Sequence, residues 1–184
     1  MKNIWTHFAM AAITAILFLI MLQLNMWLFS WLEFTAGVNW IYLPAGVRML
    51  CTLLFAEAGA VGLLAVSWFV CFYYFFPDNW ARSFTGGIVA TLAPYGTFCI
   101  ARHWLGLGSS LSQLTPTRLL ALSAIYAFAN ALLHAGLNLV LGDGVQLGQF
   151  FVMMVGDFNG TLIVLYAFKA LLMLPAKVNR YELK

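Results

Sequence analysis

Long apolar runs separated by short polar stretches are the dominant pattern along this chain. Each run is long enough to form a helix, and the expected helices span residues 6–32, 43–56, 60–76, 83–100, 119–141 and 150–174. A helix rises about 1.5 Å per residue, so about 20 apolar residues cross the ~30 Å hydrocarbon core of a bilayer. The pattern predicts an all-α fold, a polytopic membrane helical bundle of about six transmembrane helices, as a single domain over residues 1–184.

The apolar run over residues 43–76 is too long for one crossing. As a single helix it would be about 50 Å long, and it is interrupted by Glu57 within a patch of alanine and glycine. We therefore expect two helices with a turn near residues 57–59. At the end of the sixth run, Pro175 is expected to stop the helix at Leu174, because proline lacks the N–H that the helix ladder needs.

The composition indicates which solvent surrounds these helices. Hydrophobic residues make up 64% of the chain and charged residues 8%, against about 45–50% and about 25% in soluble domains. So few charges cannot cover the surface of a soluble protein of this size, so the expected partner is the lipid bilayer. Nucleic acid is not an expected partner, because no basic cluster is interleaved with aromatic residues.

The cysteines and the common catalytic motifs give no sign of a cofactor or an enzyme. Three cysteines, Cys51, Cys71 and Cys99, lie in apolar runs without a CxxC pair or a metal-ligand spacing, so no metal or other cofactor is expected. The chain contains no Gly-x-Ser-x-Gly, no HExxH and no glycine-rich phosphate loop before a helix. These absences argue against catalysis.

The placement of charge predicts the orientation in the membrane. With the N-terminus inside, six crossings place these basic residues in the cytoplasm: Lys2, Arg102, Arg118, Lys177, Arg180 and Lys184. The outer side then receives Glu33, Asp78, Asp143 and a single base, Arg82. Because basic residues accumulate on the cytoplasmic side, we predict a bacterial inner-membrane protein with both termini in the cytoplasm.

Three ionisable residues fall at one level inside the predicted helices. Arg48, His134 and Asp157 each lie about five to seven residues from the outer end of a helix, or roughly 7–11 Å below the outer surface. A charge at the centre of a membrane helix costs about 2.5–3.5 kcal/mol, so it needs a partner or a function. We expect Arg48 and Asp157 to be neighbours, directly or through His134.

Polar residues continue along the same helix faces. Tyr126, Asn130, His134 and Asn138 are spaced by four and form one stripe, which should face the bundle interior. The candidate ligand-binding residues are therefore Arg48, Asn130, His134, Asn138, Asp157 and Asn159. Three interpretations remain open: hydrogen bonds that only hold helices together, a pocket open to the outer face, and a path for protons or ions.

Two short motifs resemble a known family. Residues 40–47, Trp-Ile-Tyr-Leu-Pro-Ala-Gly-Val, resemble the aromatic–Pro–Pro–Ala–Gly segment of the first membrane-associated sensor family, the MASE group of bacterial input domains. Residues 156–160, Gly-Asp-Phe-Asn-Gly, resemble the Gly-Asp-x-x-Gly near the start of that family's last helix. The similarity covers about residues 38–174, with Leu43 in place of the second proline and with Arg48 as an additional difference.

The resemblance implies a sensory role. Members of that family feed a cyclase, kinase or phosphodiesterase domain, and the short segment after Pro175 in this chain has no room for one. We therefore expect an integral membrane sensory or ligand-binding module, with a small-molecule ligand, that signals through a protein partner or as a homo-oligomer. Two alternatives remain open. One is the substrate-binding subunit of an energy-coupling-factor-type importer, docking a partner helix at residues 56–62, and the other is a structural subunit of a membrane complex.

Overall fold

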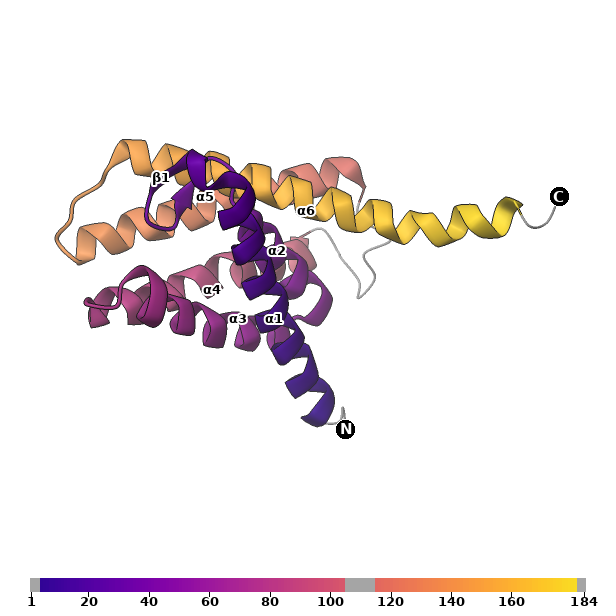
Figure 1. Cartoon of the computed structure of the whole chain (residues 1–184), viewed down its shortest axis with the longest axis horizontal. Helices are drawn as coiled ribbons and strands as arrows, with labels where there is room; N and C mark the ends of the chain where they lie inside the picture. The colour runs from indigo at the N-terminus through magenta and orange to yellow at the C-terminus, as the bar shows by residue number, and fades with distance from the viewer. Residues whose placement is uncertain (1–3, 105–114, 182–184) are drawn as a thin grey trace.

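Six α-helices and one small β-hairpin make up the part of the chain that the structure describes. The computed structural model describes residues 4–104 and 115–181, with side chains up to residue 171. Its helices are α1 (Ile4–Phe29), α2 (Leu43–Phe55), α3 (Glu57–Val70), α4 (Trp80–Trp104), α5 (Pro116–Val140) and α6 (Leu147–Tyr181) (Figure 1). A short 3-10 turn, η1 (Ser30–Leu32), and the antiparallel strands β1 (Glu33–Thr35) and β2 (Val38–Asn39) join α1 to α2. A π-helix, η2 (Cys71–Phe75), continues α3.

Five of the six helices are long and apolar enough to cross a membrane. They lie in the segments Ile4–Leu32, Glu57–Phe75, Trp80–Trp104, Pro116–Val140 and Leu147–Leu171. Helix α2 has 13 residues, or about 20 Å, which is less than the ~30 Å core of a bilayer. The predicted all-α, multi-pass membrane bundle is confirmed, with α2 as a shorter apolar helix beside five candidate spans.

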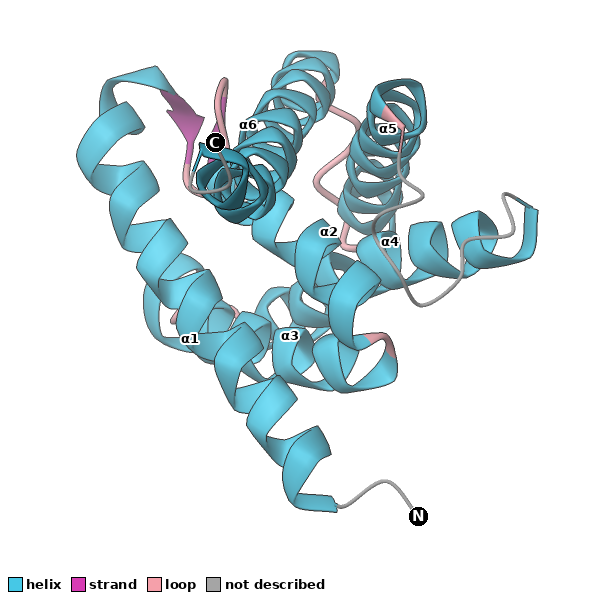
Figure 2. Ribbon diagram, turned by 90° about the vertical axis from the view of Figure 1, so that its right-hand side faces the viewer, coloured by secondary structure: helices cyan, strands magenta, loops and turns pink. Residues whose placement is uncertain are grey.

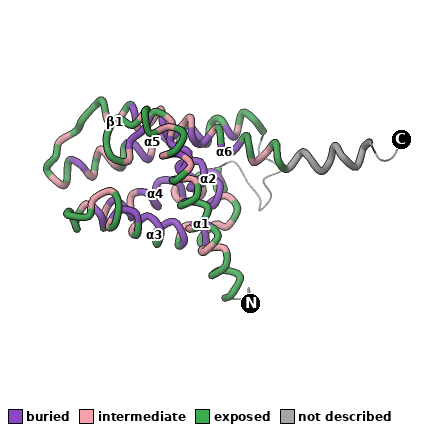
Figure 3. Tube along the Cα trace, in the orientation of Figure 1, coloured by how far each residue is buried: buried purple, intermediate pink, exposed green. Residues whose placement is uncertain are grey.

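Helix α2 lies at the centre of the bundle. It contacts α1, α3, α4 and α6, and residues 43–52 are all buried. Figure 2 shows it between the α5–α6 pair and the α1–α3 pair, and Figure 3 shows that its trace is mostly buried. A helix buried on all sides needs no lipid-facing surface. Residues 43–52 therefore pack against protein on all sides, whereas Leu54 near the end of α2 is exposed.

The start of α2 is held by a residue of α1. The buried Asn25 side chain accepts a hydrogen bond from the backbone N–H of Leu43, at 2.8 Å. Pro44 follows in the first turn, where its missing N–H would have no partner inside the helix in any case. Asn25 therefore satisfies one of the unpaired donors at this helix end and fixes where α2 begins.

Helices α2 and α3 are separate and meet at Ala56. Ala56 has φ 50° and ψ −123°, and it is the only non-glycine residue with positive φ in the described part of the chain. We expected the turn near residues 57–59, but the reversal takes a single residue and α3 begins at Glu57. The reversal is tight because α3 folds directly back on α2: a Cβ added at Gly59 would overlap the Cys51 carbonyl oxygen.

Substitutions at Ala56 should follow its backbone conformation. An L-residue held at this combination of φ and ψ is strained by about 1–3 kcal/mol, whereas glycine adopts this region readily but costs about 0.5–1 kcal/mol through the unfolded state. We expect Ala56→Gly to keep or raise the unfolding free energy by up to about 1 kcal/mol, and Ala56→Val to lower it by more than about 1 kcal/mol. Unfolding in mixed detergent micelles measures both. Equal stability of the two variants would contradict the strained turn.

Helix α6 is longer than the sequence predicted. It runs through Pro175 to Tyr181, so the predicted end at Leu174 is wrong. Proline removes one helix hydrogen bond and crowds one carbonyl, and this local loss does not end a helix whose flanking residues stay helical. With 35 residues, α6 is about 52 Å long and projects well beyond the other helices (Figure 1).

Most other helices begin up to three residues before their apolar runs. Helix α5, for example, begins at Pro116, and the Thr115 side chain accepts a hydrogen bond from the Arg118 N–H as its N-cap. Apolar runs mark the lipid-embedded part of a helix and miss its polar first turn, which capping residues stabilise.

Helix α6 packs against the hairpin and the start of α2 through two glycines. A Cβ added at Gly156 would overlap the Asn39 carbonyl oxygen, and one added at Gly160 would overlap the Tyr42 carbonyl oxygen. The Tyr42 N–H donates to the Gly156 carbonyl at 3.1 Å. Because glycine has no side chain, the two backbones approach more closely than other residues allow. The motifs at residues 40–47 and 156–160 are therefore in direct contact.

Candidate ligand-binding cavity

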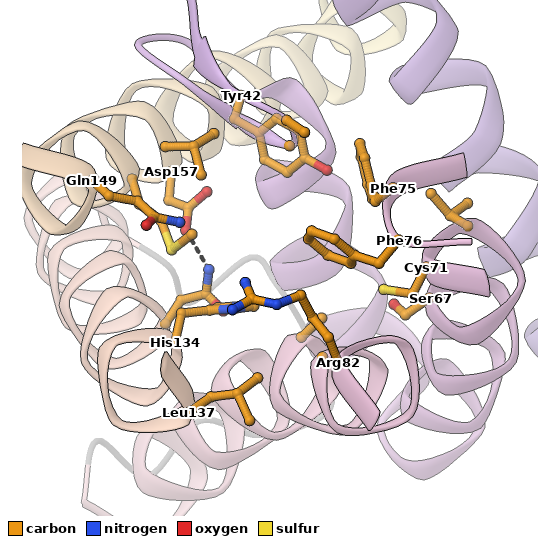
Figure 4. Close-up of a pocket in the computed structure, with 18 of the residues that line it drawn as sticks. Tyr42, Ser67, Cys71, Phe75, Phe76, Arg82, His134, Leu137, Gln149 and Asp157 are labelled. Carbon is orange, nitrogen blue, oxygen red and sulfur yellow. Dashed lines mark hydrogen bonds between the residues drawn. The ribbon is translucent and has the colours of Figure 1, made fainter. Parts of the chain in front are cut away.

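A cavity of about 70 Å³ with both polar and apolar walls lies inside the bundle. It is lined by residues 36–38 of the hairpin, by η2, and by side chains from all six helices or their flanking residues (Figure 4). The polar side chains that line it are Tyr42, Arg48, Ser67, Arg82, Asn130, His134, Asn138, Gln149 and Asp157. Aromatic residues complete the wall, among them Phe18, Phe75 and Phe76. The cavity therefore combines fixed charges, neutral hydrogen-bonding groups and apolar surface.

The structure brings five of the six candidate residues to this cavity. Arg48, Asn130, His134, Asn138 and Asp157 all line it. Asn159 does not: its amide donates to the Trp40 carbonyl at 3.4 Å. Residues two apart in a helix are rotated by about 200° around its axis. Asp157 therefore faces the cavity, whereas Asn159 faces the hairpin.

Asp157 is a buried carboxylate that one neighbouring amide holds in place. The side chains of Asp157 and Asn130 are both 2% exposed. Asn130 donates through Nδ2 to Asp157 Oδ2 at 2.6 Å, the bond drawn as a dashed line in Figure 4. No described residue donates a hydrogen bond to the other carboxylate oxygen, Oδ1. The carboxylate is thus fixed in position while one of its oxygens keeps its hydrogen-bonding capacity.

Arg48 is a buried cation that stacks on aromatic rings. It is 7% exposed, and its guanidinium carbon lies 5.1 Å from the centre of the Phe18 ring and 5.5 Å from that of Tyr42. Within the described residues, the guanidinium makes no ion pair, and its Nε is buried without a hydrogen-bond partner. The Tyr126 hydroxyl lies beside it, but no hydrogen bond of normal geometry joins them. Stacking contributes about 0.5–2 kcal/mol, less than the several kcal/mol that burying a charge costs.

Arg48 and Asp157 were expected to be neighbours, and both line the cavity, but they do not form an ion pair. No ion pair within 4.0 Å joins them in the described part of the chain, and no hydrogen bond through His134 connects them. The two side chains share the cavity instead. The physical reason is local: the rings of Phe18 and Tyr42 hold the guanidinium, and Asn130 holds the carboxylate.

Arg82 is a cavity residue that sequence reasoning assigned only to the outer surface. Its side chain, 20% exposed, forms an ion pair with Asp143 in the turn between α5 and α6. Its guanidinium carbon also lies 5.3 Å from the centre of the Phe76 ring. Arg82 therefore ties the start of α4 to the α5–α6 turn beside the cavity. Its position as the single base among acids on the predicted outer side was the signal that could have drawn attention to it.

The π-helix η2 forms a further part of the wall that the sequence did not reveal. The Phe76 N–H donates to the Cys71 carbonyl five residues earlier, at 2.9 Å. The Ser83 hydroxyl is 3.0 Å from the Cys71 carbonyl oxygen and 2.8 Å from that of Phe76, so α4 supplies a donor to backbone groups at this wide turn. Short π-helices occur frequently at functional sites, and they have no simple residue pattern.

Comparisons with protein-family models, with curated proteins and with solved structures found no match. The cavity must therefore be interpreted from its own geometry. Within residues 4–104 and 115–171, no group of three or more His, Cys, Asp or Glu side chains is placed to hold a metal ion.

Proposed function

We propose that this protein is a membrane-embedded sensory module that binds a small polar molecule in the cavity and signals through a partner protein. The observation that carries the proposal is the pair of buried opposite charges, Arg48 and Asp157, that line one cavity without pairing with each other. In a purely structural role, such charges should pair, because an unpaired buried charge is strongly destabilising. Facing a shared space, they are arranged to hold a third partner.

Helix α6 links the cavity to the far end of the bundle. It carries Asp157 in the cavity wall and continues to Tyr181, beyond the other helices (Figure 1). A ligand that contacts Asp157 would act on α6 directly. A shift of this helix at the cavity would also displace its C-terminal end. The contact between residues 40–47 and 156–160, the two motifs that resemble the MASE group, supports a sensory role for this arrangement.

The packing of the small-residue patch argues against the importer alternative. That alternative requires residues 56–62 to dock a helix of a partner protein. A Cβ added at Gly62 would overlap the Ala11 carbonyl of α1, and one at Gly59 would overlap the Cys51 carbonyl of α2. The two glycines of the patch therefore pack against α1 and α2 of this chain. They are not open to a helix of a partner protein.

The ligand-binding part of the proposal can be tested by filling the cavity. Ala90 lines the cavity and is 3% exposed, whereas Ala124 of α5 is exposed on the outside of the bundle. We expect Ala90→Leu to displace the ligand and the matched Ala124→Leu to leave it bound. Protein in lipid nanodiscs would be incubated with a metabolite extract and washed, and the retained compounds would be identified by mass spectrometry. Identical compound profiles for wild type and Ala90→Leu would contradict ligand binding in this cavity.

We further propose that the cavity end of the bundle faces the periplasm and that both termini are cytoplasmic. Arg102 and Arg118 flank the connection between α4 and α5, while Glu33, Asp78 and Asp143 lie in the hairpin and turns at the cavity end. Alkaline phosphatase is active only outside the cytoplasm. We expect it to be inactive when fused after Lys184 and active when inserted beside Asp78. The reverse pattern would show the opposite orientation.

A further inference from the structure

The hydrogen-bonding capacity that Arg48 and Asp157 keep limits what the cavity can bind. Both side chains are more than nine-tenths buried, at 7% and 2% exposed, and both line the cavity. No ion pair or hydrogen bond joins the Arg48 guanidinium to a described residue, and Asp157 Oδ1 accepts no hydrogen bond from the described residues. Arginine has donors only, and an ionised carboxylate has acceptors only. A ligand that satisfies both must carry an acceptor group and a donor group.

The charge balance of the site sharpens this requirement. Arg82 also lines the cavity, but its charge is matched by Asp143 in the ion pair. One basic group, Arg48, and one acidic group, Asp157, remain in the cavity without an ion-pair partner among the described residues. An anion alone would leave Asp157 without a partner, and a cation alone would leave Arg48 without one. A molecule that carries both charges and is neutral overall matches both residues, and this avoids an uncompensated charge in a buried site.

The size of the cavity restricts the ligand further. Its volume is about 70 Å³, and about 10–15 Å³ of such volume accommodates one water molecule. The cavity thus has room for about five to seven water-sized groups, which is close to the number of non-hydrogen atoms in the smallest amino acids. The aromatic rings of Phe75 and Phe76 in the wall tolerate both a short apolar chain and an ammonium group.

We infer that the cavity binds a small zwitterion of the amino-acid class, with its carboxylate on Arg48 and its ammonium group on Asp157. Asn130 acts as a positioning residue, because its bond to Oδ2 leaves Oδ1 for the ligand. This inference rests on the proposed function and names the chemical class of its ligand.

The test uses probes that carry one or both charges. The full chain in lipid nanodiscs is titrated with glycine, L-alanine and β-alanine, and with propionate and ethylamine as compounds that carry only one of the two charges. Ionic strength is held constant, and binding is measured by calorimetry and by the shift in unfolding temperature. We expect at least one of the three amino acids to bind wild-type protein about tenfold or more tightly than either single-charge compound, because each of those lacks one charged hydrogen-bond partner.

Two variants that each lack one of the charged side chains should each bind a different single-charge compound in place of the amino acids. Asp157→Asn removes the negative charge and keeps an acceptor for Asn130, so it should lose amino-acid binding and gain propionate binding. Arg48→Met should lose amino-acid binding and gain ethylamine binding. Asp78→Asn and Arg102→Met remove the same charges at exposed positions outside the cavity, and they should behave as wild type. If either cavity variant fails to fold, the wild-type titration still decides between the probes.

Each other outcome overturns the inference in a recognisable way. Propionate binding as tight as amino-acid binding in wild type, and unchanged in Asp157→Asn, would show a site for anions only. If no amino acid binds but another compound is retained and then lost in Ala90→Leu, the zwitterion is wrong and the proposed function stands. If nothing is retained and Ala90→Leu equals wild type, both fail together.

Discussion

Replacing Gly160 by alanine is expected to lower the unfolding free energy by about 1–3 kcal/mol or more, because the added methyl group overpacks the contact between α6 and the start of α2. The new Cβ would overlap the Tyr42 carbonyl oxygen and come 2.9 Å from the Leu43 nitrogen. These are backbone atoms, and they cannot turn aside as a flexible side chain would. The start of α2 is already held by Asn25, so the strain has no simple way to relax.

Gly136 in α5 provides the matched control. Among the described residues, no atom outside its chain neighbours and the local helix backbone lies within 4 Å of a Cβ built there. Gly136→Ala should therefore raise stability by about 0.5–1 kcal/mol through the better helix propensity of alanine. Unfolding in mixed micelles with increasing SDS measures both variants. We also expect Gly160→Ala to weaken ligand retention, since α6 carries Asp157. Equal stability of the two alanine variants would contradict the close approach of α6 to α2.

Removing both buried charges is expected to stabilise the protein while abolishing its ligand binding. The double variant Arg48→Met/Asp157→Asn should raise the unfolding free energy by about 1–4 kcal/mol, as is typical when buried ion pairs are replaced by uncharged residues. Here the wild-type charges are not in contact and recover less of their burial cost than a direct pair would. The lost stacking on Phe18 and Tyr42, about 0.5–2 kcal/mol, offsets part of the gain.

The single variants complete a double-mutant cycle. Each leaves one buried charge without its counterpart across the cavity, so Arg48→Met and Asp157→Asn should each be less stable than the double variant. Denaturant unfolding without ligand provides the four free energies, and calorimetry provides ligand binding. If the polar groups only held helices together, the double variant would be less stable than wild type. A loss of stability in the double variant would therefore favour a structural role over a ligand site.

The sequence alone determined that this is a membrane bundle and where its polar groups lie in depth. Position along a helix depends only on the number of residues from its end, at about 1.5 Å per residue. For that reason residue counting is enough to place Arg48, His134 and Asp157 at one level, and all three line the cavity. Asn130, His134 and Asn138 are four residues apart in sequence, which likewise assigned them to one face of a helix. All three line the cavity.

Only the tertiary structure decided which groups touch. Rotation about a helix axis and the choice of neighbours depend on contacts between segments far apart in the chain, such as that of Gly156 with Asn39. These contacts place Arg48 on the rings of Phe18 and Tyr42, and they place Asp157 on Asn130. They also turn Asn159 toward the segment around Trp40 and bring Arg82 to the cavity. No local pattern encodes them, because each results from the packing of whole helices against one another.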